Sequence, residues 1–445
     1  MPPVSKSLLF EFDPINQPAA PDPVERATWC ALRIRVGDRC VSTFWDKDLR
    51  GNRENLYVPA FPIAAWIVEN WWVLLNERPP GETIPAVVDE TAQFEWTRRH
   101  CLRAADSSLM LPALYVYHDG RDLTAEWRSD APGAMPHMPG EFSSDGRNVL
   151  EATATRVSLA QFVATVVDRV RGLSDRRVEE LDQHWRAIQS ADAEEERFCI
   201  LAGRMGIDPY DAETLDVQLA RFLETAFPDP DLPIVRDLTE VTTRGSIREQ
   251  WAWLESIRDE LNILPNERAP AFTSPTQQQT PSRFGYQAAR EARRIAGLAM
   301  DSPLDSVEGI ARPVLGRKFR IVARNHVPGR GVQSMVGVRD GEVVAVGPQP
   351  QRQGNQRFRA ARGFYHALTG NSQSPRLVTS AYSWDQKASR AFAAELLAPQ
   401  SALRDRALAS PVDRETVEAL SNEFAVSERV IENQLENAGI SLSCE

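Results

Sequence analysis

Two stretches in the last third of the chain, residues 357–370 and 385–399, carry apolar residues at three- and four-residue spacings. The first stretch keeps this spacing with Phe358, Ala361, Tyr365 and Leu368. In the second stretch, Ala388, Ala391, Phe392, Glu395 and Leu396 fall along one side of the predicted helix, and Pro399 is its stop signal. Because residues three and four apart share one face of a helix, both patterns predict amphipathic helices.

The N-terminal part of the chain alternates apolar and polar residues around two turn dipeptides, Gly37-Asp38 and Asp119-Gly120. This alternation predicts two β-hairpins. Residues 92–157 are expected to form strands and turns, with Ser158 as the N-cap of the helix that follows.

A Trp-rich apolar stripe lies between the two predicted hairpins. Its members are Ile63, Trp66, Ile67, Trp71, Leu74 and Leu75. We expect it to be the core helix of its domain, and a platform for a ligand or peptide is the alternative.

These patterns predict a multi-domain α+β protein. We expect a β-rich N-terminal domain at residues 1–173, which contains the Trp-rich helix, and an α-helical middle region at residues 174–264. A linker rich in Pro and Gln is expected at residues 265–285. The last domain, residues 286–445, is expected to end in two helices with helix-turn-helix spacing.

The two amphipathic helices resemble the core of the ImmA/IrrE family of HExxH metallopeptidases. In that family a helix of the type RFTLAHELGHHL carries two zinc-ligating His and a Glu base. A following helix of the type ExxANxFAAxLLMP carries the third ligand. Here RFRAARGFYHAL and DQKASRAFAAELLAP match those frameworks. The resemblance implies a zincin-like C-terminal domain of helices plus a small sheet, with an open three-stranded sheet before the first motif helix.

The chemistry of the motif differs from its framework. Alignment on the Arg-Phe pair puts Arg362 at the first His position, Gly363 at the Glu position and His366 at the second His position. The third ligand falls on Gln386. HExxH holds a metal because positions i and i+4 put two imidazoles on one helical face, with the Glu beside the metal-bound water. We therefore expect no catalytic residue, no metal ligand and no cofactor.

A vestigial site, or a cleft that binds a partner, is expected at Arg362, Gly363, His366, Asp385 and Gln386. We expect Arg362 to bridge the two helices in place of a metal, by donating to the Gln386 amide oxygen or by pairing with Asp385. The alternative is an open cleft in which Arg362 binds a carboxylate or a phosphate, with Arg357 and Arg359 as further anion-binding residues. A replacement metal site would draw on His326, His366, Asp385 and Glu395.

The net charge of −11 hides two charged segments. Residues 312–362 contain eleven Arg and Lys and only two acids. These basic residues either pair with acids elsewhere in the chain or bind nucleic acid. The helix-turn-helix-like residues 413–437 hold seven acids against two Arg, the wrong sign for contact with phosphates. Five scattered Cys without a CxxC pair, and an N-terminus without an apolar signal segment, indicate a cytoplasmic protein without a membrane partner.

The sequence therefore predicts a catalytically degenerate ImmA/IrrE-like protein. We expect a regulatory or protein-recognition module of a bacterial stress, phage-defence or mobile-element circuit, with a protein or a peptide as its partner. Two alternatives stay open. One is an active zinc metallo-endopeptidase with a rearranged metal site, and the other is a nucleic-acid- or nucleotide-binding protein that uses residues 312–362.

Overall fold

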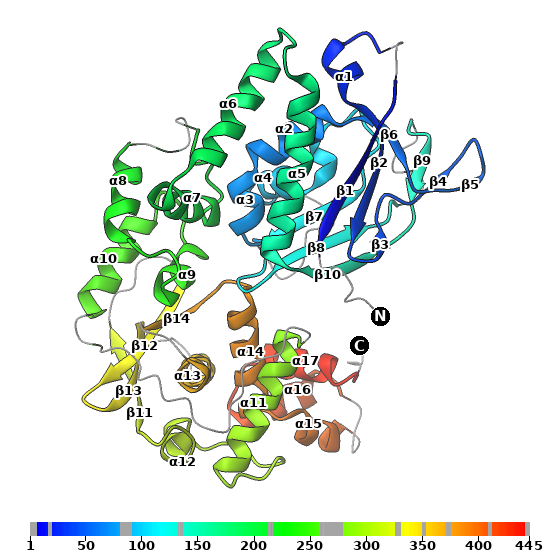
Figure 1. Cartoon of the computed structure of the whole chain (residues 1–445). Helices are drawn as coiled ribbons and strands as arrows, with labels where there is room; N and C mark the ends of the chain where they lie inside the picture. The colour runs from blue at the N-terminus through cyan, green and yellow to red at the C-terminus, as the bar shows by residue number, and fades with distance from the viewer. Residues whose placement is uncertain are drawn as a thin grey trace. The chain divides into compact units, whose positions relative to one another are not determined.

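The structure is a computed structural model of the whole chain, and it shows an α+β protein built from two compact units (Figure 1). Unit 1 is Met1–Pro230 and unit 2 is Asp231–Glu445. The described residues are 7–16, 20–80, 91–131, 133, 137–211, 215, 217–258, 261, 279–324, 331–348, 353–370, 375–407 and 412–440.

Unit 1 contains three small antiparallel sheets. Their strands are β1 (Leu8–Pro14), β2 (Trp29–Val36), β3 (Arg39–Cys40), β4 (Phe44–Asp46), β5 (Gly51–Arg53), β6 (Leu56–Pro59), β7 (Ala113–His118), β8 (Leu123–Arg128), β9 (Gly140–Phe142) and β10 (Gly146–Leu150). In the first sheet β2 pairs with β1, β3 and β6, and the other two have the orders β5-β4-β9 and β10-β8-β7. Both hairpins predicted from the turn dipeptides are present, as β2–β3 and β7–β8.

The helices of unit 1 pack on these sheets or on one another. They are α1 (Pro23–Thr28), α2 (Phe61–Glu69), α3 (Trp71–Asn76), α4 (Thr91–His100), the 3-10 helix η1 (Leu102–Ala105), α5 (Ala152–Val170), α6 (Arg176–Ser190), α7 (Ala193–Arg204) and α8 (Val217–Ala226). The Trp-rich stripe forms two helices, α2 and α3, that meet at Asn70. Trp66, Trp71 and Trp72 are buried in the core, so the stripe is a packing surface rather than an exposed platform.

Two local predictions in unit 1 are wrong. Residues 91–100 form helix α4 instead of strands and turns. Helix α5 begins at Ala152, because the Glu151 carboxylate accepts hydrogen bonds from the amides of Thr153 and Ala154 and caps the helix there. Ser158, the expected N-cap, is buried inside that helix.

Unit 2 places one sheet among helices. The strands are β11 (Phe319–Arg324), β12 (Val332–Arg339), β13 (Glu342–Pro348) and β14 (Arg376–Thr379). The helices are α9 (Pro233–Thr239), α10 (Ile247–Arg258), α11 (Pro281–Ile295), the 3-10 helix η2 (Glu308–Ile310), α12 (Ala311–Leu315), α13 (Gln353–Thr369), α14 (Trp384–Leu397), α15 (Gln400–Ala407), α16 (Arg414–Phe424) and α17 (Glu428–Asn437). The strand order is β11-β13-β12-β14, with β11 parallel to β13 and the other pairs antiparallel.

The sheet of unit 2 therefore has a fourth strand beyond the three expected. β14 is contributed by the segment between α13 and α14 and pairs with the edge of β12. The pairing is irregular between Val332 and Ser334, so Gln333 has no register partner on β14. A bulge of this kind re-aims a side chain, and Gln333 is one of the residues that meet Arg362 below.

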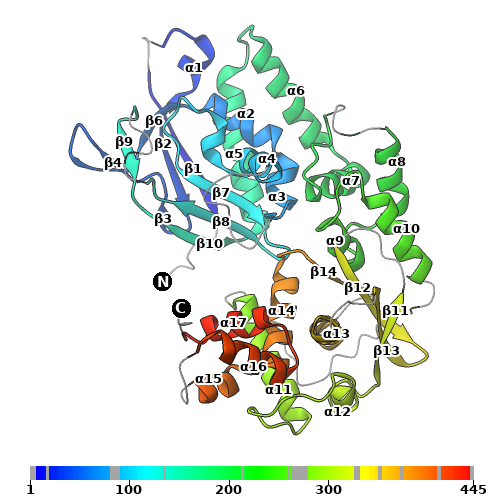
Figure 2. The same ribbon diagram turned by 180° about the vertical axis from the view of Figure 1, so that it is seen from behind.

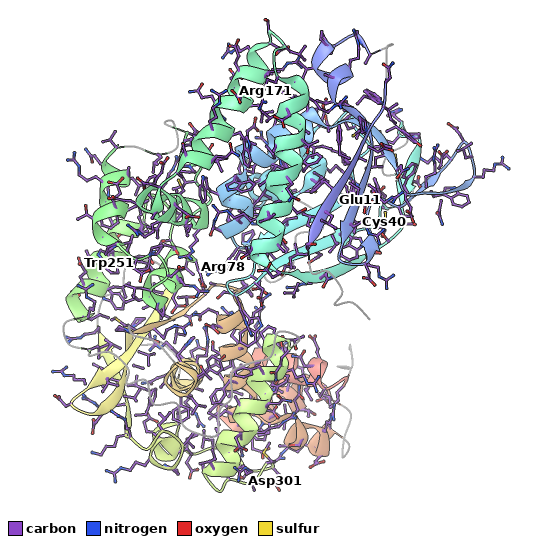
Figure 3. All side chains as sticks on the ribbon, in the orientation of Figure 1. Glu11, Cys40, Arg78, Arg171, Trp251 and Asp301 are labelled. Atoms are coloured by element: carbon purple, nitrogen blue, oxygen red, sulfur yellow. The ribbon has the colours of Figure 1, made fainter. Side chains whose placement is uncertain are left out.

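Helix α13 lies against the sheet and forms the centre of the unit 2 core (Figures 1 and 2). Ala361, Tyr365 and Leu368 are fully buried, and Phe358 is half-buried. Side chains surround the helix on every side (Figure 3). The predicted helix at residues 357–370 is thus a core element.

The division between the units falls inside the expected middle region, residues 174–264. α6 to α8 belong to unit 1, whereas α9 and α10 belong to unit 2. The expected linker at residues 265–285 lies largely outside the described residues, and α11 begins at Pro281 within its last part. No helix in the described part of the chain has the length and apolar character needed to cross a membrane.

The buried position of α13 gives a stability prediction. Leu368→Ala removes a side chain that is 1% exposed and should lower the free energy of unfolding by roughly 2–5 kcal/mol. Phe358→Ala serves as the comparison, since its ring is half-buried and its loss should cost less. Chemical denaturation of both variants measures the difference. Unfolding of Leu368→Ala at the wild-type midpoint would contradict the core position of the helix.

Candidate functional site

The candidate site lies where α13 faces α14 and β14, and its central residue is Arg362. This guanidinium is only 2% exposed. It donates to four oxygen atoms: Ser389 Oγ at 3.0 Å, Gln333 Oε1 at 2.8 Å, the Thr379 carbonyl at 2.8 Å and Gln386 Oε1 at 2.6 Å. Arg362 therefore joins α13 to α14, as the bridge to Gln386 requires, and also joins it to the sheet.

All four acceptors of Arg362 among the described residues are neutral, so none of them is a carboxylate. Burial is the largest cause that lowers the pKa of Arg362, and the nearby Arg390 lowers it further, while Asp237 opposes both. An arginine nevertheless keeps its proton in proteins. Its charge is therefore solvated by a shell of amide, hydroxyl and carbonyl dipoles in place of water.

Gln386 completes this shell in a way that only an amide can. Its Nε2 donates to the Leu377 carbonyl at 2.8 Å, and its Oε1 accepts from the Thr379 amide at 3.0 Å as well as from Arg362. A carboxylate only accepts, so a Glu at this position would face the Leu377 carbonyl without a proton to share. The neutral amide thus satisfies both a donor and an acceptor on the backbone of β14.

A second charged group, built around Arg376, anchors the same strand; Asp237 is buried, and the Asp385 side chain is about half exposed. Arg376 Nε donates to Asp237 Oδ2 at 2.9 Å, and Arg376 Nη2 donates to Asp385 Oδ2 at 2.9 Å. Although burial opposes it, Asp237 and Asp385 raise the pKa of Arg376. The pKa of Asp385 is lowered in turn: burial acts to raise it, but the charge of Arg376 outweighs that effect. Asp385 therefore pairs with Arg376 rather than with Arg362.

Sequence reasoning did not find Asp237, because it lies on α9, more than a hundred residues from β14 along the chain. It is 2% exposed and accepts from the Leu377 amide at 2.9 Å as well as from Arg376. The one available signal is an acid inside an apolar helical run, PIVRDLT, which is unusual unless the acid has a buried partner.

Together these side chains occupy the backbone groups of β14 that face away from β12. The Leu377 amide and carbonyl are taken by Asp237 and Gln386, and the Thr379 amide and carbonyl by Gln386 and Arg362. A sheet edge normally presents such groups for pairing with another strand. This edge is sealed at Leu377 and Thr379, so an added peptide strand has no free partner there.

His366 is fully buried one helical turn after Arg362. Neither ring nitrogen has a hydrogen-bond partner among the described residues. Burial lowers the pKa of His366 to about 3, and the nearby Arg376 contributes to this shift. The imidazole is therefore neutral at any physiological pH.

Gly363, at the position of the general base, lies against the sheet. A Cβ added there would meet Val336 Cγ2 at 3.3 Å, Ala345 Cβ at 3.5 Å and Phe319 Cζ at 3.6 Å. The absence of a side chain lets α13 pack closely on β12 and β13. This position is thus part of the apolar core and offers no room for a solvated carboxylate.

Arg357 and Arg359 donate hydrogen bonds to main-chain carbonyls and do not point into an open cleft. Arg357 donates to the Leu304 carbonyl, and Arg359 donates to the carbonyls of Pro348 and Gln333. Burial lowers the pKa of both guanidinium groups. Both residues therefore fasten α13 to its surroundings, which leaves them little capacity for an external anion.

The donor set at this site does not suit a metal ion. Arg362 and Gln386 stand where two ligands would be needed, and His366 alone contributes an imidazole. Of the replacement ligands, Glu395 is paired with Arg290 at 2.7 Å, and His326 lies outside the described residues. In the described part of the chain, no three His, Cys, Asp or Glu side chains are grouped so that they could hold a metal.

Four basic residues in the described part of the segment 312–362 are buried or paired with acids. Arg362 is buried, and Lys318, Arg320 and Arg339 pair with Glu342 or Asp340. The acidic pair α16–α17 keeps the expected short turn between its helices. The seven acids of residues 413–437 have the wrong sign for contact with phosphates.

No protein-family model matches the chain, and no curated protein matches it.

The buried shell of Arg362 predicts a large effect of truncation. Arg362→Ala should lower the free energy of unfolding by roughly 3 kcal/mol, because Gln333 Oε1 and Ser389 Oγ lose a buried donor and a void is left. Arg390→Ala is the matched control: Arg390 is half-buried and also donates to the Thr379 carbonyl, and its loss should cost less than about 1 kcal/mol. Equal melting of Arg362→Ala and wild type would show that the bridge is not structural.

Proposed function

We propose that this chain is a catalytically degenerate relative of the ImmA/IrrE metallopeptidases that acts as a regulatory or protein-recognition module. The proposal places it in the cytoplasm, in a bacterial stress, phage-defence or mobile-element circuit. Its partner is a protein, and it performs no metal-dependent hydrolysis. The observation that carries this proposal is the hydrogen bond from Arg362 to Gln386.

That hydrogen bond joins the two positions that a zinc ion would join in the related peptidases. Arg362 stands at the first ligand position and Gln386 at the third, and their atoms are 2.6 Å apart. A structural metal ties its ligands together and stabilises the fold. Here the guanidinium supplies an equivalent tie between α13 and α14 without a metal, which supports a scaffold retained for its shape.

The surroundings of the bridge support recognition rather than hydrolysis. A hydrolytic site needs a base within reach of water and a place for the scissile bond. Arg362, His366 and Gln386 are all buried, and the edge of β14 is occupied by side chains. We infer that the partner contacts the outside of the intact module and that the former site serves as its internal brace.

Restoring metal ligands at positions 362 and 386 tests two parts of the proposal together: the relation to the ImmA/IrrE metallopeptidases and the loss of their zinc site. The double variant Arg362→His/Gln386→His places two further imidazoles near His366, and a neutral His at position 386 can donate to the Leu377 carbonyl from one ring nitrogen and bind a metal with the other. This variant should hold about one zinc per chain after dialysis, measured by elemental analysis. Wild type and the single variant Arg362→His, which lacks the third ligand, should hold none.

Two results would contradict the proposal. Stoichiometric zinc in the wild-type protein that is lost in His366→Ala would show a working metal site. A folded double variant that binds no zinc would remove the support for a peptidase-like scaffold.

A further inference from the structure

The two edge strands of the sheet in unit 2, β14 and β11, differ in how their outward backbone groups are used (Figure 1). On β14, side chains of the protein occupy those groups at Leu377 and Thr379. β11 is the opposite edge and pairs with β13 in a parallel register. The open side of an edge strand presents N–H and C=O groups with which another strand can pair.

The register of β11 identifies the groups on its open side. The Val343 amide donates to the Lys318 carbonyl at 2.8 Å. Because backbone groups alternate in direction along a strand, the even-numbered residues of β11 face β13 and the odd-numbered residues face away. The outward amides and carbonyls of Ile321 and Ala323 have no hydrogen-bond partner among the described residues. Ile321 is half-buried and Ala323 is exposed, so this part of the edge is accessible.

The side chains of β11 divide into an apolar face and a basic face. Phe319 packs in the core against Phe364, with ring centroids 5.6 Å apart, and Ile321 packs against the same core. The basic side chains on the opposite face are those of Lys318, Arg320 and Arg324. Residues 317–324 contain four basic residues and no acid.

The basic face keeps a positive charge after its ion pairs are counted. Lys318 and Arg320 share one carboxylate, that of Glu342, at 3.1 and 3.7 Å. Their side chains are 58% and 52% exposed, so an external charge can reach both. A second copy of β11 would bring like charges together, which destabilises a sheet, whereas a strand that carries acids would neutralise them.

We propose that β11 is a docking edge for an extended segment of a partner protein in which acidic and apolar residues alternate. The backbone of that segment pairs with the outward groups of Ile321 and Ala323. Its acids face Lys318 and Arg320, and its apolar side chains extend the face that Ile321 begins. Strand addition of this kind takes affinity from main-chain hydrogen bonds and specificity from alternate side chains.

The open backbone groups favour a protein over a nucleic acid as the partner. Phosphates would satisfy the basic face, but they would leave the carbonyls of Ile321 and Ala323 without a donor, whereas a peptide backbone supplies both donors and acceptors. The inference rests on the proposed function in one respect, namely that the partner is a protein. The docking edge lies across the sheet from β14, so peptide binding and the zinc content of the variants at positions 362 and 386 can fail separately.

A synthetic peptide in which Glu and Val alternate is the probe for this edge. When it is added to the full chain at low salt, backbone hydrogen exchange of Ile321 and Ala323 should slow several-fold, because both amides gain an acceptor. A peptide with Lys in place of Glu should have no effect. Unchanged exchange of both amides at the highest soluble concentration of the Glu peptide would overturn the proposal.

Ala323→Pro is the decisive variant, because it removes an outward N–H and keeps the hydrogen bonds to β13. It should weaken binding of the Glu peptide about tenfold, the effect of one lost hydrogen bond. Ala323→Thr keeps the N–H and should bind like wild type. Equal binding by Ala323→Pro and wild type would contradict strand addition.

Two further measurements complete the test. If a single-stranded oligonucleotide competes with the peptide and Ala323→Pro weakens neither, the basic face is a phosphate site and the proposal fails. If Ala323→Pro does not fold, the double variant Arg317→Glu/Lys318→Glu takes its place. This variant should lose peptide binding because it reverses the charge beside the edge, and unchanged binding would overturn the proposal.

Discussion

A buried guanidinium needs an acceptor for nearly every donor it carries, and this requirement shapes the candidate site of unit 2. Arg362 meets it with oxygens from α14, from β14 and from the bulged Gln333 of β12. Each acceptor is held by contacts of its own, since Gln386 is fixed by Leu377 and Thr379, and Ser389 donates to the Gln386 carbonyl. One cation thus fixes the relative positions of two helices and the edge of a sheet.

The same requirement explains why the site offers few free polar groups to an external ligand. Most polar groups around the described site already have partners within the protein, including the backbone of β14 and the guanidinium groups of Arg357 and Arg359, whereas the ring nitrogens of His366 have none among the described residues. An interior arranged in this way stabilises a shape and leaves recognition to the surface. The two fully buried histidines differ in their contacts. Both ring nitrogens of His100 lie within hydrogen-bond distance of oxygen atoms, whereas those of His366 have no hydrogen-bond partner among the described residues.

The features that depend on neighbouring residues, namely the tight turns and the amphipathic helices, could be predicted from the sequence. The hairpins at Gly37 and Gly120 form because both glycines adopt positive φ, and the motif helices form on their apolar spacing. The sequence also placed Arg362 beside Gln386, through the resemblance to the peptidase helices. Helix α4 was missed because its polar sequence TAQFEWTRRH has a weak apolar period, although Trp96 and His100 lie one turn apart on its buried face. The cap of α5 was missed because Glu is a rarer N-cap than Ser.

Long-range partners could not be predicted from one sequence. Asp237 meets Arg376, and Glu77 meets His100, only because the fold brings separate elements together. The fourth strand, β14, is four residues long, so it carries too short a pattern to be recognised beforehand. These contacts determine which charged groups are paired and which backbone groups of β14 are occupied. The chemistry of the site could therefore not be predicted without the structure.

The most direct test of the account is the coupling between Arg362 and Gln386. A double-mutant cycle with Arg362→Met, Gln386→Leu and the combined variant, followed by chemical denaturation, isolates their interaction from the cost of each change. If the guanidinium ties α13 to α14, the coupling free energy should be roughly 1.5–3 kcal/mol, the range of a buried hydrogen bond to a charged group. A coupling near zero would show that the two side chains only share a place in the core.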